Sequence, residues 1–366
     1  MEIAITLSAI KIILAGTLSF LFAFLITPPL THILYTKKLW RKEVRERAID
    51  GGDVPVFRQF HKDKEIGTPR FGGVLIWVSV PVLALVSGVL GSTGSWWLEK
   101  MSFLSRSQTW LPLATLIASS AVGFLDDILQ VIQPPAQGLK QWIWTTFGQY
   151  IAGGLSFRYR FLLVAIIGLV GAWWFVTKLG VTAISIPWAG SLELGLFFIP
   201  IFVIVMLATY SGGVIDGLDG LAGGAFASSF AAFGMIAFSQ GQIDLAAFCM
   251  AIVGALLAFL WFNIPPARFY MGETGVIGLT ATLSVVAFLT DSVLVLPIIA
   301  LPLVMESGSV IIQLLSKRFR KKKVFRAAPL HHHFEALGWP HYKITMRFWI
   351  IGVVTAFIGV IVKLLG

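Results

Sequence analysis

The chain has 366 residues, of which 57% are hydrophobic and 13% are charged, and it carries a formal net charge of +10. This charged fraction is about half that of an average soluble protein, so the composition excludes a soluble globular domain. Cys249 is the only cysteine, which excludes a disulfide framework and a cysteine-based metal site. The positive charge is not accompanied by a basic and aromatic binding module, so we expect no nucleic-acid partner.

Apolar stretches of about 20 residues, long enough to cross a bilayer as helices, recur along the whole chain. The first lacks a basic start and a small-residue cleavage site, so it is predicted to be a span and not a signal peptide. The ten predicted spans lie near residues 4–26, 71–90, 109–125, 161–179, 196–211, 221–239, 243–262, 275–290, 292–315 and 346–365. The sequence therefore predicts an all-α polytopic membrane protein, with one integral membrane domain over residues 1–366.

Lysine and arginine are distributed unevenly between the two sides that ten spans define. Most of the 28 basic residues lie in or beside the first, third, fifth, seventh and ninth loops, especially in residues 36–70. Because cytoplasmic loops are enriched in lysine and arginine, these loops are predicted to be cytoplasmic and both termini to lie outside. The net charge mostly reflects this bias, and it also favours contact with anionic lipid headgroups.

One predicted outer segment differs from the other loops. Residues 181–195, "VTAISIPWAGSLELG", alternate apolar and polar residues around a turn that contains proline and glycine. This pattern is typical of a short β-hairpin. We therefore expect a small hairpin on the outer face between the fourth and fifth spans.

Two adjacent acids, Asp126 and Asp127, end the third span in "GFLDDILQV". They could simply solvate the end of a helix. Alternatively, like charges held together raise one pKa or recruit a divalent cation. Ionisable groups at membrane depth are costly and are usually functional or paired, so this pair is a candidate catalytic site.

The fifth loop carries a second acidic pair, Asp216 and Asp219, in the glycine-rich stretch "YSGGVIDGLDGLAGG". Their spacing of three would place them on one face of a helix. The glycines allow a close approach of backbone to ligand, and a helix that begins there would favour phosphate. A role as plain helix caps is the alternative.

The seventh loop, "WFNIPPARFYMGETG", supplies Asn263, Arg268 and Glu273. It lies on the same predicted side as the two acidic pairs and as the last loop, although these segments are spread over much of the chain. We therefore expect the four segments to converge on one cleft at the inner face.

The last loop contains three consecutive histidines, His331, His332 and His333. Side chains of neighbouring residues diverge on a helix or strand, so a three-histidine zinc site is not favoured. One or two of the rings could instead donate hydrogen bonds to phosphate or sugar oxygens, and His333 could pack against "FEALGW". Glu306, within the ninth predicted span, is interpreted as a packed structural acid.

Five motifs together resemble the translocase I family, the phospho-N-acetylmuramoyl-pentapeptide transferases, within the polyprenyl-phosphate N-acetylhexosamine-1-phosphate transferases. They are "GTPRFGG" (67–73), "FLDD" (124–127), "DGLDGLA" (216–222), "MGETG" (271–275) and "APLHHHFEALGWP" (328–340). The last motif is the most specific, since it separates this family from relatives that use N-acetylglucosamine donors. The ten spans, the outer termini and the outer hairpin also fit the family.

The resemblance implies transfer of phospho-MurNAc-pentapeptide from UDP to undecaprenyl phosphate, giving lipid I and UMP in peptidoglycan synthesis. It implies a Mg²⁺ cofactor, a location in the bacterial inner membrane with the active site on the cytoplasmic face, membrane lipid as surroundings, and a homodimer as a frequent assembly. The implied catalytic residues are Asp126, Asp127 and Asp216; the implied metal ligands are Glu273, Asp126 and Asp127; the implied substrate-binding residues are Lys64, Asp219, Asn263, Tyr270, Gln313, His331 and His332. Direct transfer and a covalent aspartyl intermediate both remain open.

Some residues depart from the family pattern at the site itself. The usual "NxxNxxDG" reads "YSGGVIDG" here, and the usual "MGD" reads "MGE", which places Glu273 where an aspartate is expected. A lysine that commonly follows the acidic pair is Gln137. Glutamate remains a hard oxygen ligand for Mg²⁺, so the expectation is an active enzyme. An enzyme with another UDP-N-acetylhexosamine donor and an inactive relative are the alternatives.

A membrane transporter is a rival of another class, because intramembrane acids and glycine breaks also mark substrate paths. The acids gather at one face here and not at the midplane, and the sequence shows no inverted repeat. Both features favour an enzyme.

Overall fold

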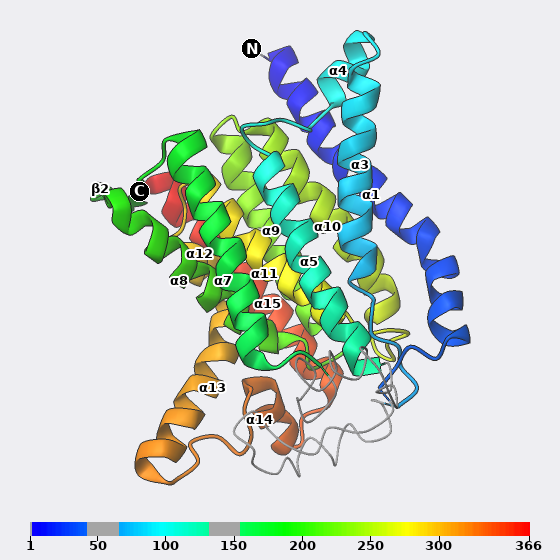
Figure 1. Ribbon diagram of the computed structural model, residues 1–366, viewed down its shortest axis with the longest axis vertical. Coiled ribbons are helices and arrows are strands. Elements are labelled where there is room, and N and C mark those ends of the chain that lie inside the picture. Colours follow the sequence, from blue (N-terminus) through cyan, green and yellow to red (C-terminus); the bar gives the residue numbers. More distant parts are fainter. Residues whose placement is uncertain (1, 42–65, 132–153) are drawn as a thin grey trace, which may run out of the picture.

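The computed structural model describes residues 2–41, 66–131 and 154–366, and these form a bundle of long helices with one small hairpin (Figure 1). The long helices are α1 (Glu2–Thr36), α3 (Val74–Gly91), α5 (Trp110–Val131), α7 (Phe157–Trp174), α8 (Phe198–Ser211), α9 (Leu221–Ser239), α10 (Ile243–Asn263), α11 (Gly272–Leu289), α13 (Leu301–Arg320) and α15 (His341–Leu365). The short elements are α4 (Trp96–Met101), η1 (Phe175–Leu179), η2 (Gly195–Phe197), η3 (Gly212–Ile215), α12 (Leu296–Ile299) and α14 (Leu330–Ala336).

Within the described residues, nine helical segments are long and apolar enough to cross a membrane. They correspond to nine of the ten predicted spans, so the chain is a polytopic, all-α membrane protein. Such helices satisfy every backbone hydrogen bond internally, which the hydrocarbon interior of a bilayer demands.

The ninth predicted span, 292–315, does not form one continuous apolar helix, and this part of the prediction was wrong. It is divided at Ala300 into α12 and α13, each with a proline in its first turn. Proline lacks the N–H that continues a helix but fits well at a helix start, so Pro302 favours a new helix there. Helix α13 also continues past the predicted end at 315, and its last turn carries Lys317, Arg318 and Arg320.

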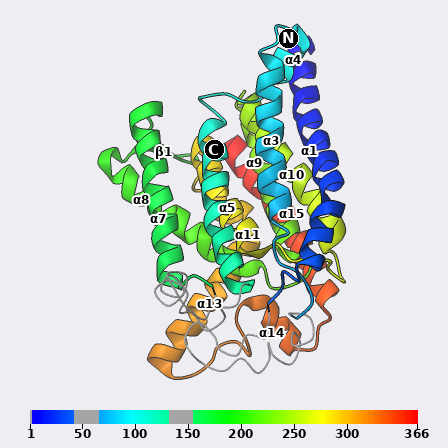
Figure 2. The same cartoon turned by 45° about the vertical axis from the view of Figure 1, so that its right-hand side comes forward.

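The centre of the bundle is α11, which is almost entirely buried and lies beside α5 (Figures 1 and 2). Glycines allow the two backbones to approach. A Cβ added at Gly123 would lie 2.1 Å from the carbonyl oxygen of Glu273, and one at Gly278 would lie 2.0 Å from the Ser120 hydroxyl. Small residues at helix contacts are the usual device of membrane proteins, and here they bring the Asp126–Asp127 end of α5 against the start of α11.

The predicted hairpin is confirmed as secondary structure. Strand β1 (Ala183–Ile186) pairs antiparallel with β2 (Gly190–Glu193), between η1 and η2. The Asp291 carboxylate accepts a hydrogen bond from the backbone N–H of Ser185 at 2.8 Å, and Lys363 near the chain end bonds to the Asp291 carbonyl at 2.7 Å. The hairpin is therefore held against α15 and the end of α11.

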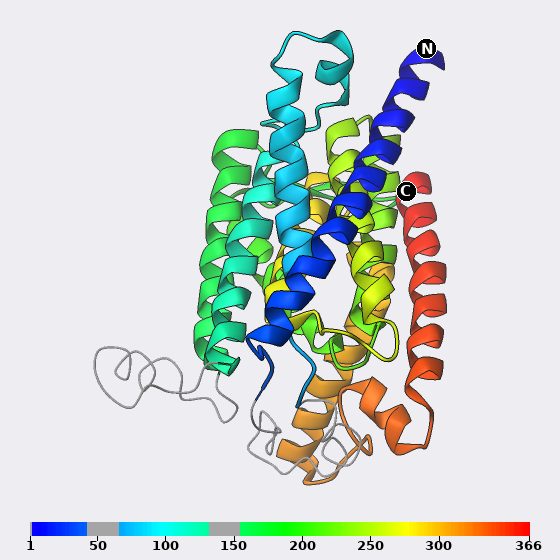
Figure 3. The same cartoon turned by 90° about the vertical axis from the view of Figure 1, so that its right-hand side faces the viewer.

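Both ends of the chain lie at the same end of the bundle (Figure 3). The opposite end carries α14 and the basic end of α13 (Figure 1). This arrangement agrees with termini on one side and the last loop on the other. Which side is cytoplasmic stays a prediction from the distribution of basic residues.

Candidate active site

Asp126 lies in the last turns of α5 with its side chain fully buried. One carboxylate oxygen accepts a hydrogen bond from the backbone N–H of Leu155 at 2.5 Å, and the other accepts one from Gln130 Nε2 at 2.6 Å. Gln130 is one helical turn further along α5, so the helix itself places its amide beside the acid. Asp126 is thus a held, buried carboxylate and not a solvated helix end.

Asp127 is also fully buried, and it faces the N-terminus of α11. Its two oxygens accept the backbone N–H groups of Glu273, at 3.1 Å, and Thr274, at 2.8 Å. The first turn of a helix leaves such N–H groups without intrahelical partners and favours negative charge. Gly272 has a positive φ of 72°, and a Cβ there would lie 2.5 Å from an Asp127 oxygen, so glycine is required for this contact.

The glycine-rich fifth loop brings Asp216 to the same helix start. Its carboxylate accepts the N–H of Gly272 at 3.2 Å, next to the amides that hold Asp127. Burial raises the pKa of Asp216 to about 6, with Glu273 adding to the increase and Arg70 opposing it. The structure therefore brings together acids from the third span and the fifth loop, as the sequence predicted.

Two arginines that the sequence analysis did not assign to the site lie among these acids. Arg70 Nε lies 3.6 Å from an Asp127 oxygen. Arg160 Nη1 lies 2.6 Å from Glu273 Oε1 and 3.5 Å from an Asp126 oxygen, so it bridges the two carboxylates. Arg70 belongs to the "GTPRFGG" motif, which could have indicated its place in the site. Arg160 lies at the edge of the fourth predicted span, where a basic residue is explained by membrane topology alone.

Glu273 was predicted to be a metal ligand, but its carboxylate is paired with an arginine. Its carboxylate is bonded to Arg160, and about a quarter of its side chain is exposed. Among the described residues, no three His, Cys, Asp or Glu side chains are grouped as ligands for one ion. Mg²⁺ commonly takes only one or two protein carboxylates and fills its remaining positions with substrate phosphates and water.

The charge balance of the cluster fits a divalent cation. Asp126, Asp127 and Asp216 all lie within electrostatic reach of Glu273, and two guanidinium groups lie among these four carboxyl groups. When all the carboxyl groups are ionised, the cluster therefore has two more negative than positive charges. Hard carboxylate oxygens in such excess are the donors that Mg²⁺ prefers.

His331 is fully buried at the start of α14 and is oriented by Glu306 of α13. The imidazole Nδ1 lies 2.9 Å from Glu306 Oε2, and the backbone N–H of His331 bonds to the same carboxylate. Burial lowers the pKa of His331, but the Glu306 carboxylate raises it more, so the net shift is upward. The interpretation of Glu306 as a hydrogen-bonded acid is confirmed, and its partner is the first histidine of the triplet.

The free edge of the His331 ring points at the fifth loop. Its Nε2 is buried without a hydrogen-bond partner, and a Cβ added at Gly217 would lie 2.1 Å from it. Gly217 directly follows Asp216. The histidine and the aspartate cluster therefore meet at a glycine that leaves room for nothing larger than hydrogen.

The other two histidines turn to different partners. His332 Nδ1 is bonded to Glu335, and Glu335 also contacts His341 at 2.8 Å. His333 Nδ1 accepts the backbone N–H of Arg326 at 3.2 Å. The His331 and His332 rings nevertheless lie against each other, with centroids 4.1 Å apart, so the expected divergence does not hold for this pair. Each of these two rings is bonded to a glutamate of its own.

Asn263 and Asp219 hold the fifth and seventh loops together. The Asn263 amide accepts the N–H of Gly220 at 2.9 Å and donates to the carbonyl of Phe269 at 2.8 Å. Asp219 accepts the N–H of Ala267 at 3.2 Å. Both residues, predicted to bind substrate, are therefore engaged with backbone groups that shape the loop walls.

The other residues predicted to bind substrate, Tyr270, Gln313 and Lys64, do not share one location. The backbone of Tyr270 bonds to Pro69 and Gly72 and joins the seventh loop to the "GTPRFGG" segment. The Gln313 amide bonds to Val324 and Phe325, so it folds the basic loop after α13. Lys64 lies outside the described residues.

Comparison with known proteins agrees with the family that the sequence motifs indicated. Residues 109–291 match the family model described as "Glycosyl transferase family 4". A phospho-N-acetylmuramoyl-pentapeptide-transferase of Geobacillus thermodenitrificans is 34% identical over 355 residues, 96% of this chain and 98% of the relative. Proteins of the same name from Levilactobacillus brevis and Listeria welshimeri are each 36% identical, over 81% and 82% of this chain and 85% of each relative. The chain therefore belongs to the phospho-N-acetylmuramoyl-pentapeptide-transferase family, within glycosyl transferase family 4.

Proposed function

We propose that this protein transfers phospho-MurNAc-pentapeptide from its UDP donor to undecaprenyl phosphate, which gives lipid I and UMP in peptidoglycan synthesis. The observation that carries the proposal is the buried Asp126–Asp127 pair, with Asp127 held at a helix N-terminus, in a chain similar along almost its whole length to enzymes with that name. The relatives are bacterial, so the bacterial inner membrane is the proposed location, with the site on the cytoplasmic face.

In the proposed reaction, an oxygen of the lipid phosphate attacks the β-phosphorus of the UDP-sugar. The bond between the two donor phosphates breaks, UMP leaves with the bonding electrons, and any proton on the attacking oxygen passes to a carboxylate of the Asp126–Asp127 pair. Phosphoryl transfer requires alignment and charge neutralisation more than covalent protein chemistry. Arg70 and Arg160, each beside one member of the pair, supply fixed positive charge for that purpose.

Mg²⁺ is the cofactor that the acid cluster fits, and Asp127 and Asp216 are the residues proposed to hold it. They accept consecutive N–H groups at the start of α11, which fixes both carboxylates at one place. When bound, Mg²⁺ would neutralise the donor diphosphate. The predicted contribution of Glu273 as a third ligand stays a prediction, because Arg160 competes for the same carboxylate.

The histidines are proposed to act on the donor. His331 Nε2 has no partner and faces the fifth loop, and Glu306 on Nδ1 fixes the orientation of the ring. A protonated imidazole held in this way can donate a hydrogen bond to a donor phosphate or sugar oxygen. Asp219, Asn263 and Tyr270 would shape the nucleoside pocket through the loops that they tie together.

Release of UMP by purified protein in lipid nanodiscs tests the proposal. Undecaprenyl phosphate would be offered with UDP-MurNAc-pentapeptide, UDP-N-acetylglucosamine or no donor, beside the variant Asp127→Asn and the control Glu99→Gln, which alters an exposed acid of α4. UMP is expected only with the pentapeptide donor, and only from wild type and the control. Release with UDP-N-acetylglucosamine alone would assign another donor, and transport of a donor without any UMP would favour a transporter.

A further inference from the structure

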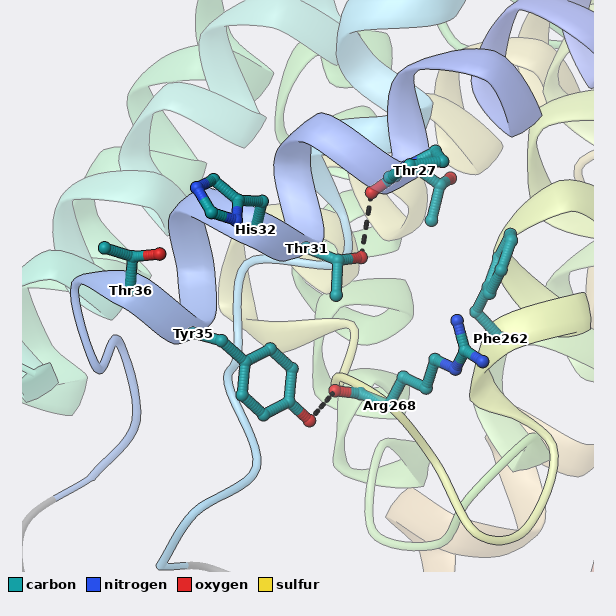
Figure 4. A pocket seen from close by; sticks show the side chains of 8 residues that line it. Thr27, Thr31, His32, Tyr35, Thr36, Phe262 and Arg268 are labelled. Atoms are coloured by element: carbon teal, nitrogen blue, oxygen red, sulfur yellow. Dashed lines mark hydrogen bonds between the residues drawn. The ribbon is translucent and has the colours of Figure 1, made fainter.

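An open pocket of about 420 Å³ lies between the last turns of α1 and the seventh loop (Figure 4). Its lining residues are Thr27, Pro28, Thr31, His32, Tyr35, Thr36, Phe262 and Arg268. Neither the motifs nor the acid cluster uses any of the α1 residues. The pocket therefore needs an explanation of its own.

The geometry of α1 and α10 explains why the pocket exists. The two helices touch closely at Gly16 and Gly254, where a Cβ on Gly254 would lie 2.0 Å from the Gly16 carbonyl oxygen. Toward their other ends the contact is made by aromatic rings, with the centroids of Phe24 and Phe262 5.2 Å apart. Beyond these rings the helices no longer fill the space between them, so the pocket opens at the end of the bundle where the acid cluster lies.

Arg268 is the one permanently charged side chain among the residues that line the pocket, and the other polar ones are hydroxyl groups and His32. The Arg268 guanidinium lies 5.5 Å from the Phe262 ring centroid, and no carboxylate within the described ranges pairs with it. His32 is exposed on α1, and Lys37 follows one residue after that helix ends. The Tyr35 hydroxyl donates to the Arg268 carbonyl at 2.9 Å, which joins the two walls (Figure 4). Such a site attracts an anion.

The surroundings of the pocket are apolar and exposed. Leu25 and Ile33 on α1, and Trp261 and Ile264 at the end of α10, are large hydrophobic residues with 71%, 48%, 65% and 48% of their surface exposed. Tryptophan and tyrosine beside cationic side chains are typical of the boundary between hydrocarbon and headgroups. A soluble anion would make no use of this apolar surface, but acyl chains would cover it.

We propose that this pocket binds the phosphate headgroup of an anionic membrane phospholipid, whose acyl chains lie along the exposed apolar surface of α1 and α10. The headgroup contacts Arg268, while Lys37 and a protonated His32 on the neighbouring turns add to the positive field. The Arg268 loop also donates the Ala267 N–H to Asp219 and accepts the Asn263 amide at Phe269. A bound lipid therefore steadies the loop that shapes the proposed nucleoside pocket.

Native mass spectrometry of protein released from nanodiscs tests this without an activity assay. Wild type would be compared in phosphatidylcholine alone and in an equal mixture with phosphatidylglycerol of the same acyl chains. Wild type is expected to retain phosphatidylglycerol in preference to phosphatidylcholine. Arg268→Gln is expected to lower retention of phosphatidylglycerol about fivefold, because the attraction of one basic residue near the bilayer surface to anionic lipid corresponds to about that factor in binding. His32→Gln is expected to lower it less.

Arg320→Gln is the matched control, because it removes the same charge from the exposed last turn of α13, outside the pocket. It is expected to retain lipid as wild type does. Equal retention of both lipids by wild type, or equal losses in Arg268→Gln and Arg320→Gln, would overturn the proposal. Displacement of the retained lipid by millimolar inorganic phosphate alone would also overturn it and would reassign the pocket to a soluble anion.

Discussion

The aspartate cluster (Asp126, Asp127 and Asp216) and the histidine cluster (His331 and His332) face each other across Gly217. The groups that hold the side chains of the two clusters carry opposite charge. In the first, buried carboxylates are held by the backbone amides of α11 and by two arginines. In the second, buried imidazoles are held by the carboxylates of Glu306 and Glu335. An anionic half suits metal and proton transfer, and a half that presents imidazole N–H donors suits phosphate and sugar oxygens. The comparison indicates that the charges of the two halves must be tested separately.

The largest effect is expected from neutralising the acid pair. Asp126→Asn and Asp127→Asn should each lower UMP release by about a thousandfold or more, because an amide can neither accept a proton nor hold Mg²⁺ well. The measurement is turnover in nanodiscs, with size-exclusion elution to verify folded protein. Turnover like that of wild type in both variants would remove the pair from the mechanism.

The second prediction separates two roles for Glu273. If Glu273 acts by fixing Arg160, then Glu273→Gln and Arg160→Gln should lower turnover similarly, by about a hundredfold. Neither should shift the Mg²⁺ concentration for half-maximal rate. The test is a magnesium titration of both variants and of Glu273→Asp, which should be impaired but active. A shift of that midpoint in Glu273→Gln alone would restore the residue as a metal ligand.

The third prediction concerns the contact between the two clusters. A Cβ at Gly217 would lie 2.1 Å from His331 Nε2, so Gly217→Ala should push the ring from the fifth loop. Misplacement on this scale is expected to lower kcat/KM for the UDP donor by up to about a hundredfold. Gly308→Ala on α13 is the control, because open space surrounds that position. Full activity in Gly217→Ala would show that the two halves need not touch.

The smallest effect is a pH dependence of stability. His331 has a raised pKa because the Glu306 carboxylate outweighs the effect of burial, so the ion pair adds stability below pH 6.5 and loses it as the pH rises through the raised pKa. Glu306→Gln removes that contribution. The difference in melting temperature between wild type and variant should therefore be larger near pH 6 than near pH 9. A difference that does not change with pH would argue for a neutral His331.

The acidic residues of the candidate site were predictable because burying a carboxylate in a membrane protein costs free energy, so such residues are usually functional or paired. Asp126, Asp127 and Asp216 stand out in an apolar chain, and the structure places Asp127 and Asp216 at one helix start, with Asp126 next to Asp127 on α5. The arginines did not stand out, since basic residues at span ends are common and are explained by topology. The roles of Asn263 and Gln313 could not be read from the sequence either, because an amide that binds a ligand and one that binds backbone look the same there.

The sequence by itself determined the class of the protein and the number of apolar spans to within one, because hydropathy and helix length are local properties that the bilayer enforces. It also determined the family, through motifs that are continuous in the chain. Only the tertiary structure decided which partner each charge has. The bond of Glu273 to Arg160 and the orientation of His331 toward Gly217 depend on residues far apart in the sequence. Such contacts are set by the closeness of helices at glycines, which no local pattern encodes.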